Sequence, residues 1–285
     1  MVERRVTIVE VGPRDGLQNE PGFVPTALKL DLINRLAHAG LRRIEATAFV
    51  SPKWVPQMAD HAEVMAGVTR QSAIAYSALV PNEKGAAAAI TAGADALAVF
   101  TAASETFSRR NTNCSISEGI TRFRPVMALA EKAGLPVRGY ISCALDCPYE
   151  GTIAPEAVAD VAARLFDLGC AEIAVSDTIG TGTPERTTRA FEATARHVPM
   201  AALAGHFHDT KNGALANVEA ALALGVRVFD GAVGGLGGCP YAEGAPGNLA
   251  TEKLVAWLEK AGWETNLNGA EIAKTAMWIR HRLKV

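Results

Sequence analysis

Two hydrophobic patterns alternate along almost the whole chain, and this alternation limits its possible folds more than any other feature. Short apolar runs with a strand-like composition are separated by longer runs with helical spacing, and Gly or Pro marks many of the boundaries. The predicted strands cover residues 6–11, 43–48, 72–79, 94–100, 137–143, 171–176, 202–208 and 228–233. The predicted helices cover residues 26–39, 55–66, 83–92, 115–133, 155–168, 184–197, 212–224 and 250–260.

These patterns make eight strand–helix units. Strands that alternate with helices pair in parallel, because each helix returns the chain to the same edge of the sheet. Eight units without a clear boundary predict a single (β/α)8 TIM barrel domain made of residues 1–285, with residues 266–285 as a helical appendage outside the barrel. A doubly wound open sheet is the alternative. It needs a GxGxxG motif after the first strand, and residues 12–16 read Gly-Pro-Arg-Asp-Gly instead.

The composition argues against several classes of function. A net charge of −2 gives no basic surface for nucleic acid, and no uncharged apolar run is long enough to span a membrane. The five cysteines include no CxxC pair, so we expect reduced thiols and no structural zinc site. The chain enters a strand-like run almost at once, from which we expect no targeting segment and a cytoplasmic, bacterial protein.

Polar residues stand where most of the predicted strands end. In a barrel of this type the chemistry lies at the C-terminal ends of the strands, so these side chains are expected to face one common mouth. In chain order they are Arg14, Asp15, Glu45, Ser142, Asp177, His206, His208 and, after the last strand, Asn248.

His206 and His208 give the sharpest local signal. Residues two apart on a strand point the same way, while Phe207 between them points to the other side, so both imidazoles can reach one metal ion. One core histidine and one helix-capping histidine would explain the pair equally well. Asp15 favours the metal, because the first and last strands become neighbours when the barrel closes. Mixed imidazole and oxygen ligands suit Mg²⁺ or Mn²⁺, and Zn²⁺ remains an alternative.

The other strand-end groups are less specific. A structural salt bridge across the barrel mouth is an alternative explanation for the adjacent charges of Arg14 and Asp15. We expect Glu45 and Asp177 to hold Arg14 or a ligating histidine in orientation rather than to transfer protons. Cys239 lies in residues 231–248, where seven of eighteen residues are glycine. No strand or helix pattern carries its thiol into a core, and a simple linker is the alternative interpretation.

Taken together, these segments resemble the 3-hydroxy-3-methylglutaryl-CoA (HMG-CoA) lyase family, within the wider group of metal-dependent barrel lyases and Claisen-type synthases. The resemblance spans nearly the whole chain. It is strongest in VEVGPRDGLQNE (9–20), IEATAFVSPKWVPQMAD (44–60), SCALDCPYEG (142–151), SDTIGTGTP (176–184), HFHDT (206–210) and GLGGCPYAEGAPGNLATE (235–252).

The resemblance implies a site and a reaction. Retro-Claisen cleavage of HMG-CoA would give acetyl-CoA and acetoacetate, as in leucine degradation and ketone-body metabolism, with Mg²⁺ or Mn²⁺ and no organic cofactor, in a homodimer. The implied base is His206 or an aspartate, Arg14 would stabilise the enolate, and Cys239, on a loop closing over the substrate, or a water would reprotonate it. The implied metal ligands are Asp15, His206, His208 and Asn248. The implied catalytic residues are Arg14, His206, Cys239, Asp177 and Glu45, and the implied substrate-binding residues are Arg14, Gln18, Ser142 and Gly238.

The sequence departs from the family pattern at Pro21, Ser176 and Lys211. Because these positions flank the matched segments, substrate identity is less constrained than reaction type. Cleavage of a related 3-hydroxy-3-methylacyl-CoA, such as citramalyl-CoA, is therefore one alternative. A condensing acyltransferase of the same barrel group is another, although such chains usually carry a long C-terminal extension. A metal-binding structural protein would leave Arg14 and Cys239 unexplained.

Overall fold

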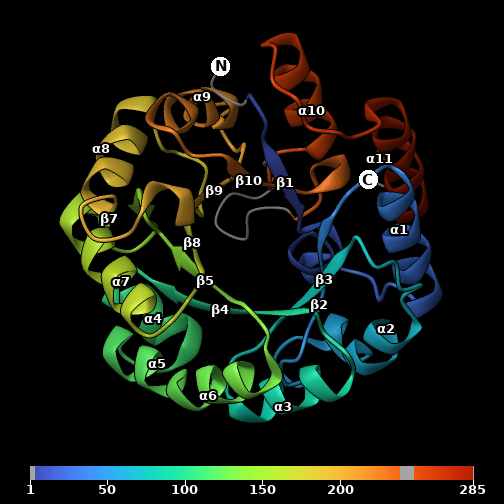
Figure 1. The fold of residues 1–285 in the computed structure, drawn as a ribbon, viewed down its shortest axis with the longest axis horizontal. Coiled ribbons are helices and arrows are strands. Elements are labelled where there is room, and N and C mark those ends of the chain that lie inside the picture. The colour runs from blue at the N-terminus through green and yellow to red at the C-terminus, as the bar shows by residue number, and fades with distance from the viewer. Residues whose placement is uncertain (1–3, 238–246, 285) are drawn as a thin grey trace.

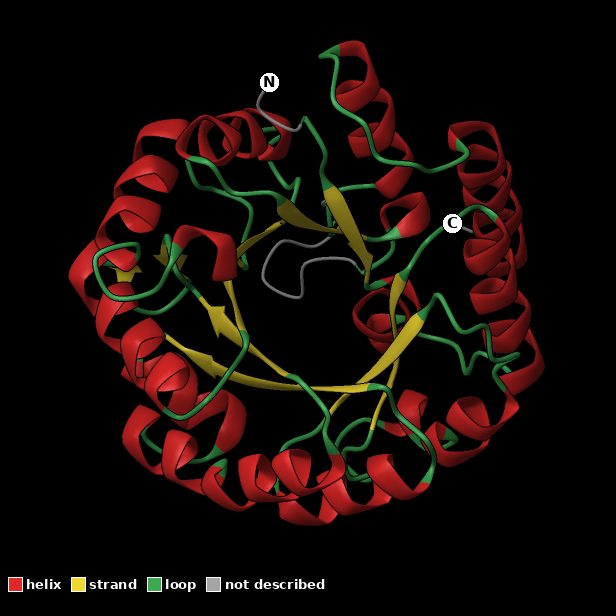
Figure 2. Ribbon diagram, viewed as in Figure 1, coloured by secondary structure: helices red, strands yellow, loops and turns green. Residues whose placement is uncertain are grey.

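The computed structural model describes residues 4–237 and 247–284. Within them the chain forms a closed barrel of parallel strands inside a ring of helices (Figure 1, Figure 2). Going round the barrel, the strand order is β1-β10-β9-β8-β5-β4-β3-β2, so β1 and β10 close it. The predicted TIM barrel is confirmed, and the open-sheet alternative is wrong.

The barrel strands lie close to their predicted positions. They are β1 (Thr7–Glu10), β2 (Arg43–Ala48), β3 (Ala75–Leu79), β4 (Ala96–Ala102), β5 (Val137–Ser142), β8 (Glu172–Asp177), β9 (Leu203–Phe207) and β10 (Val228–Gly231). A short antiparallel hairpin that the sequence patterns did not predict, β6 (Asp146–Cys147) with β7 (Gly151–Thr152), follows β5.

The described helices cover the outside of the barrel. They are α1 (Thr26–His38), α2 (His61–Gly67), α3 (Glu83–Thr91), α4 (Glu105–Thr112), α5 (Ile116–Arg122), α6 (Arg124–Ala133), α7 (Pro155–Asp167), α8 (Pro184–Thr194), α9 (Ala214–Leu224), α10 (Thr251–Lys260) and α11 (Gly269–Leu283). Among the helices within residues 4–237 and 247–284, none is both long enough and apolar enough to cross a bilayer.

Two predicted helices differ from the observed ones. The continuous helix expected over 115–133 is divided into α5 and α6, and a proline in the first turn of α6 accounts for the break because it supplies no N–H to the preceding turn. The helix expected over 55–66 becomes a 3-10 turn, Pro56–Met58, followed by α2. The additional helix α4 begins where the Ser104 side chain accepts a hydrogen bond from Phe107 N.

The C-terminal helix α11 lies in the helical ring beside α1 and α10 (Figure 1). Ile272 and Ile279 on it are fully buried, and the Arg35 guanidinium of α1 lies 4.2 Å from the ring centre of Trp278. The segment predicted as an appendage is therefore outside the strands but packed into the layer that surrounds them.

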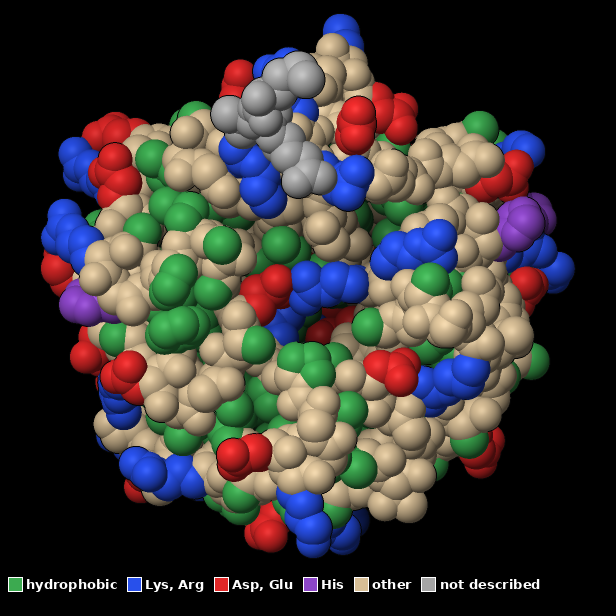
Figure 3. Space-filling model, viewed as in Figure 1, with side chains coloured by type: hydrophobic (Ala, Val, Ile, Leu, Met, Phe, Trp, Pro, Cys, Tyr) green, Lys and Arg blue, Asp and Glu red, His purple; other side chains and the backbone are tan. Residues whose placement is uncertain are grey.

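The inside of the barrel is polar, unlike the apolar layer between strands and helices. Ile44, Val99 and Ile173 are fully buried in that apolar layer. Arg138 on β5 and Asp230 on β10 instead meet across the barrel, with 2.7 Å between Nη2 and Oδ1. Figure 3 shows acidic and basic side chains together in the hollow at the centre of the ring. The fold thus holds a charged interior directly below the strand ends.

Candidate active site at the carboxyl ends of the strands

A tight turn after β1 places the first two polar residues. The chain winds through one π-helical turn, Gly12–Gly16, in which three successive backbone N–H groups, those of Arg14, Asp15 and Gly16, donate to the carbonyl of Val11. A Cβ on Gly16 would lie 2.7 Å from Leu236 Cβ, so only glycine fits there without displacing a neighbour. This turn carries Arg14 and Asp15 at the barrel mouth.

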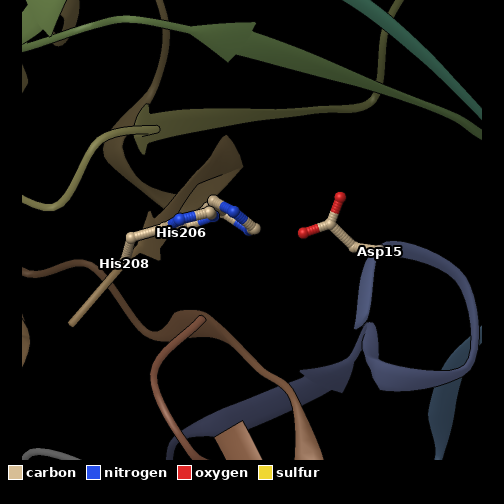
Figure 4. A group of neighbouring side chains, drawn as sticks. All are labelled: Asp15, His206 and His208. Atoms are coloured by element: carbon tan, nitrogen blue, oxygen red, sulfur yellow. The ribbon is translucent and has the colours of Figure 1, made fainter. Parts of the chain in front are cut away.

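Three predicted metal ligands converge at this mouth. One ligand atom each from Asp15, His206 and His208 can be chosen so that all lie within 4.8 Å of one another. Figure 4 shows both imidazoles pointing toward the Asp15 carboxylate. Asn248 forms a backbone bridge with His208, and its Nδ2 donates to Asp15 Oδ2 at 2.8 Å. The structure therefore brings all four predicted ligands together.

The protonation states of these side chains suit a divalent cation. Burial, assisted by the neighbouring His206, lowers the pKa of His208 to about 4, so its imidazole is neutral near pH 7. Its buried Nδ1 has no hydrogen-bond partner among the described residues. Burial opposes ionisation of Asp15, but Arg14, His206, His208 and the Asn248 hydrogen bond together outweigh it and hold the pKa of that carboxyl well below its usual range. A carboxylate, an unpaired imidazole nitrogen and an amide are ligands that Mg²⁺, Mn²⁺ or Zn²⁺ accepts.

Arg14 is held in place by two carboxylates. It is 6% exposed, its Nε donates to Glu45 Oε1 and its Nη1 donates to Asp15 Oδ1. The Tyr140 hydroxyl donates to the other oxygen of Glu45 at 3.1 Å. Burial disfavours the charged guanidinium, but Glu45 and then Asp15 raise the pKa of Arg14 above its ordinary value. Arg14 is thus a fixed cation beside the ligand cluster, and Glu45 has the anchoring contact expected from the sequence.

A second chain of contacts reaches His206 from inside the barrel. Asp230 Oδ2 lies 3.0 Å from His206 Nδ1, and Asp230 Oδ1 accepts from Arg138 at 2.7 Å. The Arg138 Nε in turn lies 2.8 Å from Glu172 Oε1. Sequence reasoning missed Arg138, Tyr140, Glu172 and Asp230. The available signal was a charged or polar residue inside each of three strand patterns that were otherwise apolar.

The connected ionic groups are not electrically balanced. They comprise three arginines, Arg14, Arg43 and Arg138, and four carboxylates, Asp15, Glu45, Glu172 and Asp230. With His206, which faces Asp230, counted as neutral, three positive and four negative charges leave one uncompensated negative charge. Since Asp15 is the carboxylate at the mouth, this excess further suits a bound cation there.

The remaining predicted site residues are placed differently. The Asp177 carboxylate accepts hydrogen bonds from the backbone of Gly180, Thr181 and Gly182, at 3.1, 3.3 and 2.9 Å, and so shapes the loop after β8. Because of burial, the pKa of Asp177 is raised. Gln18 Nε2 is 3.5 Å from Asp15 Oδ1, at the limit of a hydrogen bond, and Ser142 is half-buried at the end of β5. Gly238 and Cys239 lie outside the described residues.

Fold and site define a TIM-barrel protein with a polar, cation-suited centre at the carboxyl ends of its strands. The family model described as HMGL-like matches residues 5–279. The chain belongs to this family. The resemblance inferred from the sequence motifs is therefore confirmed.

Named relatives cover the chain from end to end. It is 54% identical over 278 residues to the hydroxymethylglutaryl-CoA lyase of Pseudomonas mevalonii, covering 98% of this chain and 92% of that one. Its fold matches the HMG-CoA lyase from Brucella melitensis with a TM-score of 0.97 and 51% identity, covering 99% and 100% of the two chains. An HMG-CoA lyase from Acinetobacter baumannii, in complex with coenzyme A and 3-methylmalate, matches with a TM-score of 0.94 and 36% identity, covering 100% and 93%.

Proposed function

We propose that this protein is a carbon–carbon lyase that cleaves HMG-CoA to acetyl-CoA and acetoacetate. A relative bearing the name of that lyase matches 98% of the chain. The observation that carries the proposal is the convergence of Asp15, His206 and His208 beside the buried cation of Arg14. Cleavage of the carbon–carbon bond of HMG-CoA needs a polarised hydroxyl on one side of the bond and a stabilised enolate on the other. The ligand cluster can serve the hydroxyl, and Arg14 can serve the enolate.

A divalent cation, Mg²⁺ or Mn²⁺, would be held by Asp15, His206, His208 and the amide oxygen of Asn248. When bound, such a cation lowers the pKa of a coordinated hydroxyl and so eases its ionisation near pH 7. The Asn248 Nδ2 is used in hydrogen bonds to Asp15 Oδ2 and Leu236 O, at 2.8 and 3.2 Å, which leaves Oδ1 as its ligand atom. The charge of Asp15 and the neutrality of His208 keep both ready for this role at neutral pH.

His206 has one open nitrogen and two proposed roles. Its Nδ1 is occupied by Asp230, so Nε2 alone is available either to ligate a cation or to accept a proton. One lone pair cannot do both at once. His206 therefore acts as the base only while Nε2 is not ligating, and otherwise an aspartate takes the proton.

Arg14 would stabilise the enolate oxygen that forms as the bond breaks. Its bonds to Glu45 and Asp15 use Nε and Nη1, so Nη2 is available for a substrate oxygen. Because the guanidinium is already fixed before substrate arrives, little reorganisation accompanies the new charge. We assign Cys239 or a water to reprotonation of the enolate and Gln18, Ser142 and Gly238 to substrate binding. Homodimer formation and a cytoplasmic location stay predictions from the sequence.

A related acyl-CoA is the second candidate substrate. The structure of the A. baumannii relative is a complex with coenzyme A and 3-methylmalate. This chain departs from the family pattern at Ser176, which pairs with His206 on the neighbouring strand. Ser176 is therefore at the mouth, where it can affect which acyl group fits.

The test compares purified protein on HMG-CoA, citramalyl-CoA and 3-methylmalyl-CoA, each after chelation and after addition of Mg²⁺ or Mn²⁺. We expect the highest kcat/KM for HMG-CoA and dependence on the added cation. A higher kcat/KM for either other thioester would replace the proposed substrate. Full activity in metal-stripped protein would rule out the cation.

A further inference from the structure

Arg138 lies inside the barrel and connects His206 with Arg14 without contacting either: Asp230 stands between it and His206, and Tyr140 and Glu45 stand between it and Arg14. Arg138 is 7% exposed and buried among strands β5, β8 and β10. Its Nη2 donates to Asp230 Oδ1 at 2.7 Å, and its Nη1 donates to the Tyr140 hydroxyl at 3.0 Å. Its guanidinium carbon lies 4.7 Å from the centre of the Tyr140 ring. One planar side chain thus fixes the positions of two others.

The contact with Asp230 determines what His206 presents to the mouth. With Oδ1 of Asp230 accepting from Arg138, the carboxylate is oriented so that Oδ2 meets His206 Nδ1 at 3.0 Å. A carboxylate held by a guanidinium offers only acceptor oxygens, so Nδ1 carries the imidazole hydrogen. Nε2 then keeps its lone pair, directed at Asp15 and the cation site.

The contact with Tyr140 determines the position of Arg14. Because Arg138 donates to the Tyr140 oxygen, the hydroxyl hydrogen is turned toward Glu45 Oε2, 3.1 Å away. Glu45 in turn accepts from Arg14 Nε. The rings of His206 and Tyr140 also pack in a T-shaped arrangement, with 6.0 Å between ring centres. Both arms of the network therefore begin at Arg138.

We propose that Arg138 is a positioning residue for the reaction: through Asp230 it fixes His206 with hydrogen on Nδ1 and Nε2 open, and through Tyr140 and Glu45 it fixes Arg14. The proposal deepens the function proposed above and rests on its cation site. The fork shape of the guanidinium matters as well as its charge, because a lysine at this position cannot donate in the same fixed directions to Asp230 and Tyr140.

Arg43 provides a matched control within the same network. It pairs with Glu172 through two hydrogen bonds, at 2.9 and 2.7 Å, and Glu172 is also the partner of Arg138 Nε. Arg43 is about one-third exposed, and only Glu172 connects it to Arg138 and so to His206. Arg43→Gln therefore removes an arginine from the same ionic chain without touching Asp230 or Tyr140.

The first measurement uses metal-free wild-type protein and does not depend on any variant. Imidazole ¹⁵N chemical shifts, assigned with a His206→Gln reference sample, report which ring nitrogen carries hydrogen. We expect hydrogen on Nδ1 of His206. Hydrogen on Nε2 would overturn the proposal, whether or not the protein binds a cation.

The second measurement compares Mn²⁺ binding by wild type, Arg138→Lys, Arg138→Gln and Arg43→Gln, each checked for folding by circular dichroism. Loss of a partner behind a ligating histidine typically weakens metal binding about 10–100-fold, and we expect this for both Arg138 variants. Arg43→Gln should keep wild-type affinity. Folded Arg138 variants with wild-type Mn²⁺ affinity and unchanged His206 shifts would refute the proposal.

Tyr140→Phe separates the two arms. It removes only the hydroxyl, so the Asp230–His206 contact stays intact. We expect nearly wild-type Mn²⁺ affinity and His206 shifts, but a lower kcat through Arg14. Weakened Mn²⁺ binding in this variant would contradict the two-arm arrangement. If wild type itself bound no Mn²⁺, the cation site of the proposed function would fail, while the ¹⁵N measurement would still decide the tautomer.

Discussion

Replacing Arg14 with glutamine tests the reaction chemistry most directly. In the wild type Arg14 is bonded to Glu45 and Asp15, and each carboxylate has a second partner: Tyr140 for Glu45, at 3.1 Å, and Asn248 for Asp15, at 2.8 Å. Neither carboxylate is left without a hydrogen bond, so we expect Arg14→Gln to fold with a loss of about 1–3 kcal/mol in the free energy of unfolding. That is less than the ~3–5 kcal/mol typical of a buried charge left unpaired.

The effect on the rate should be larger than the effect on substrate binding. Negative charge reaches the enolate oxygen only as the carbon–carbon bond breaks, so the lost guanidinium is missed mainly in the transition state. Removing one such donor typically lowers kcat about 10²–10³-fold, equivalent to about 2.7–4 kcal/mol. Arg14→Lys keeps the charge but not the two-pronged geometry, and we expect it to recover only part of this loss.

Steady-state kinetics with HMG-CoA, at saturating Mg²⁺, separate kcat from KM in the three proteins. Mn²⁺ affinity and urea unfolding, measured in parallel, show whether a lower rate comes from a lost cation or from lost structure. If Arg14→Gln raised KM by the larger factor and left kcat near the wild-type value, Arg14 would be a binding contact for the thioester, and its proposed role with the enolate would be wrong.

Three further predictions follow from the site and its surroundings. Chelation should abolish turnover, and Mg²⁺ or Mn²⁺ should restore it in the same HMG-CoA assay; activity that persists after verified metal removal would contradict the ligand set. Burial raises the pKa of Glu10 from 4.5 to about 7, so the contribution of Glu10 to stability should be greatest below about pH 4.5 and fall by roughly 3 kcal/mol as pH rises to 7. Glu10→Gln should flatten that profile in urea titrations at several pH values, and an unchanged slope would refute the assignment. A Cβ on Gly205 would lie 2.7 Å from the Phe207 ring and 2.9 Å from the Phe229 ring, so Gly205→Ala should lower the free energy of unfolding by about 1–3 kcal/mol. Gly22→Ala, with nothing within 4 Å of the new Cβ, is its control and should be nearly neutral.

Much of the site was predictable because it depends on strand ends. The hydrophobic period marks where each strand stops, and closure of a parallel barrel brings all those ends to one mouth, whatever their separation in sequence. Asp15 and His208 are almost two hundred residues apart along the chain, yet both were expected there and both lie there. The bounds of a strand were less predictable where the strand is too short to show a hydrophobic period, as in the hairpin β6–β7, whose two strands have two residues each.

Asp177 shows why the rest was not predictable. On a strand, side chains alternate between the two faces, so a residue's position at a strand end does not tell which face it takes. The register of β8 against β9 decides this, because paired residues of parallel strands face the same side. Ser176 pairs with His206 and so faces the barrel interior, whereas Asp177 pairs with Phe207 and faces outward. Its carboxylate therefore binds the backbone of the following loop instead of Arg14 or a histidine.

The sequence by itself determined the barrel, the mouth at which its polar residues gather and the family to which the chain belongs. These depend on local periodicity and on contiguous motifs, both of which are carried by neighbouring residues. Only the tertiary structure decided that Arg138, Asp230 and Tyr140 stand behind His206 and Arg14. Those contacts join strands up to 95 residues apart, and they form only when strand register and barrel closure set the direction of every side chain.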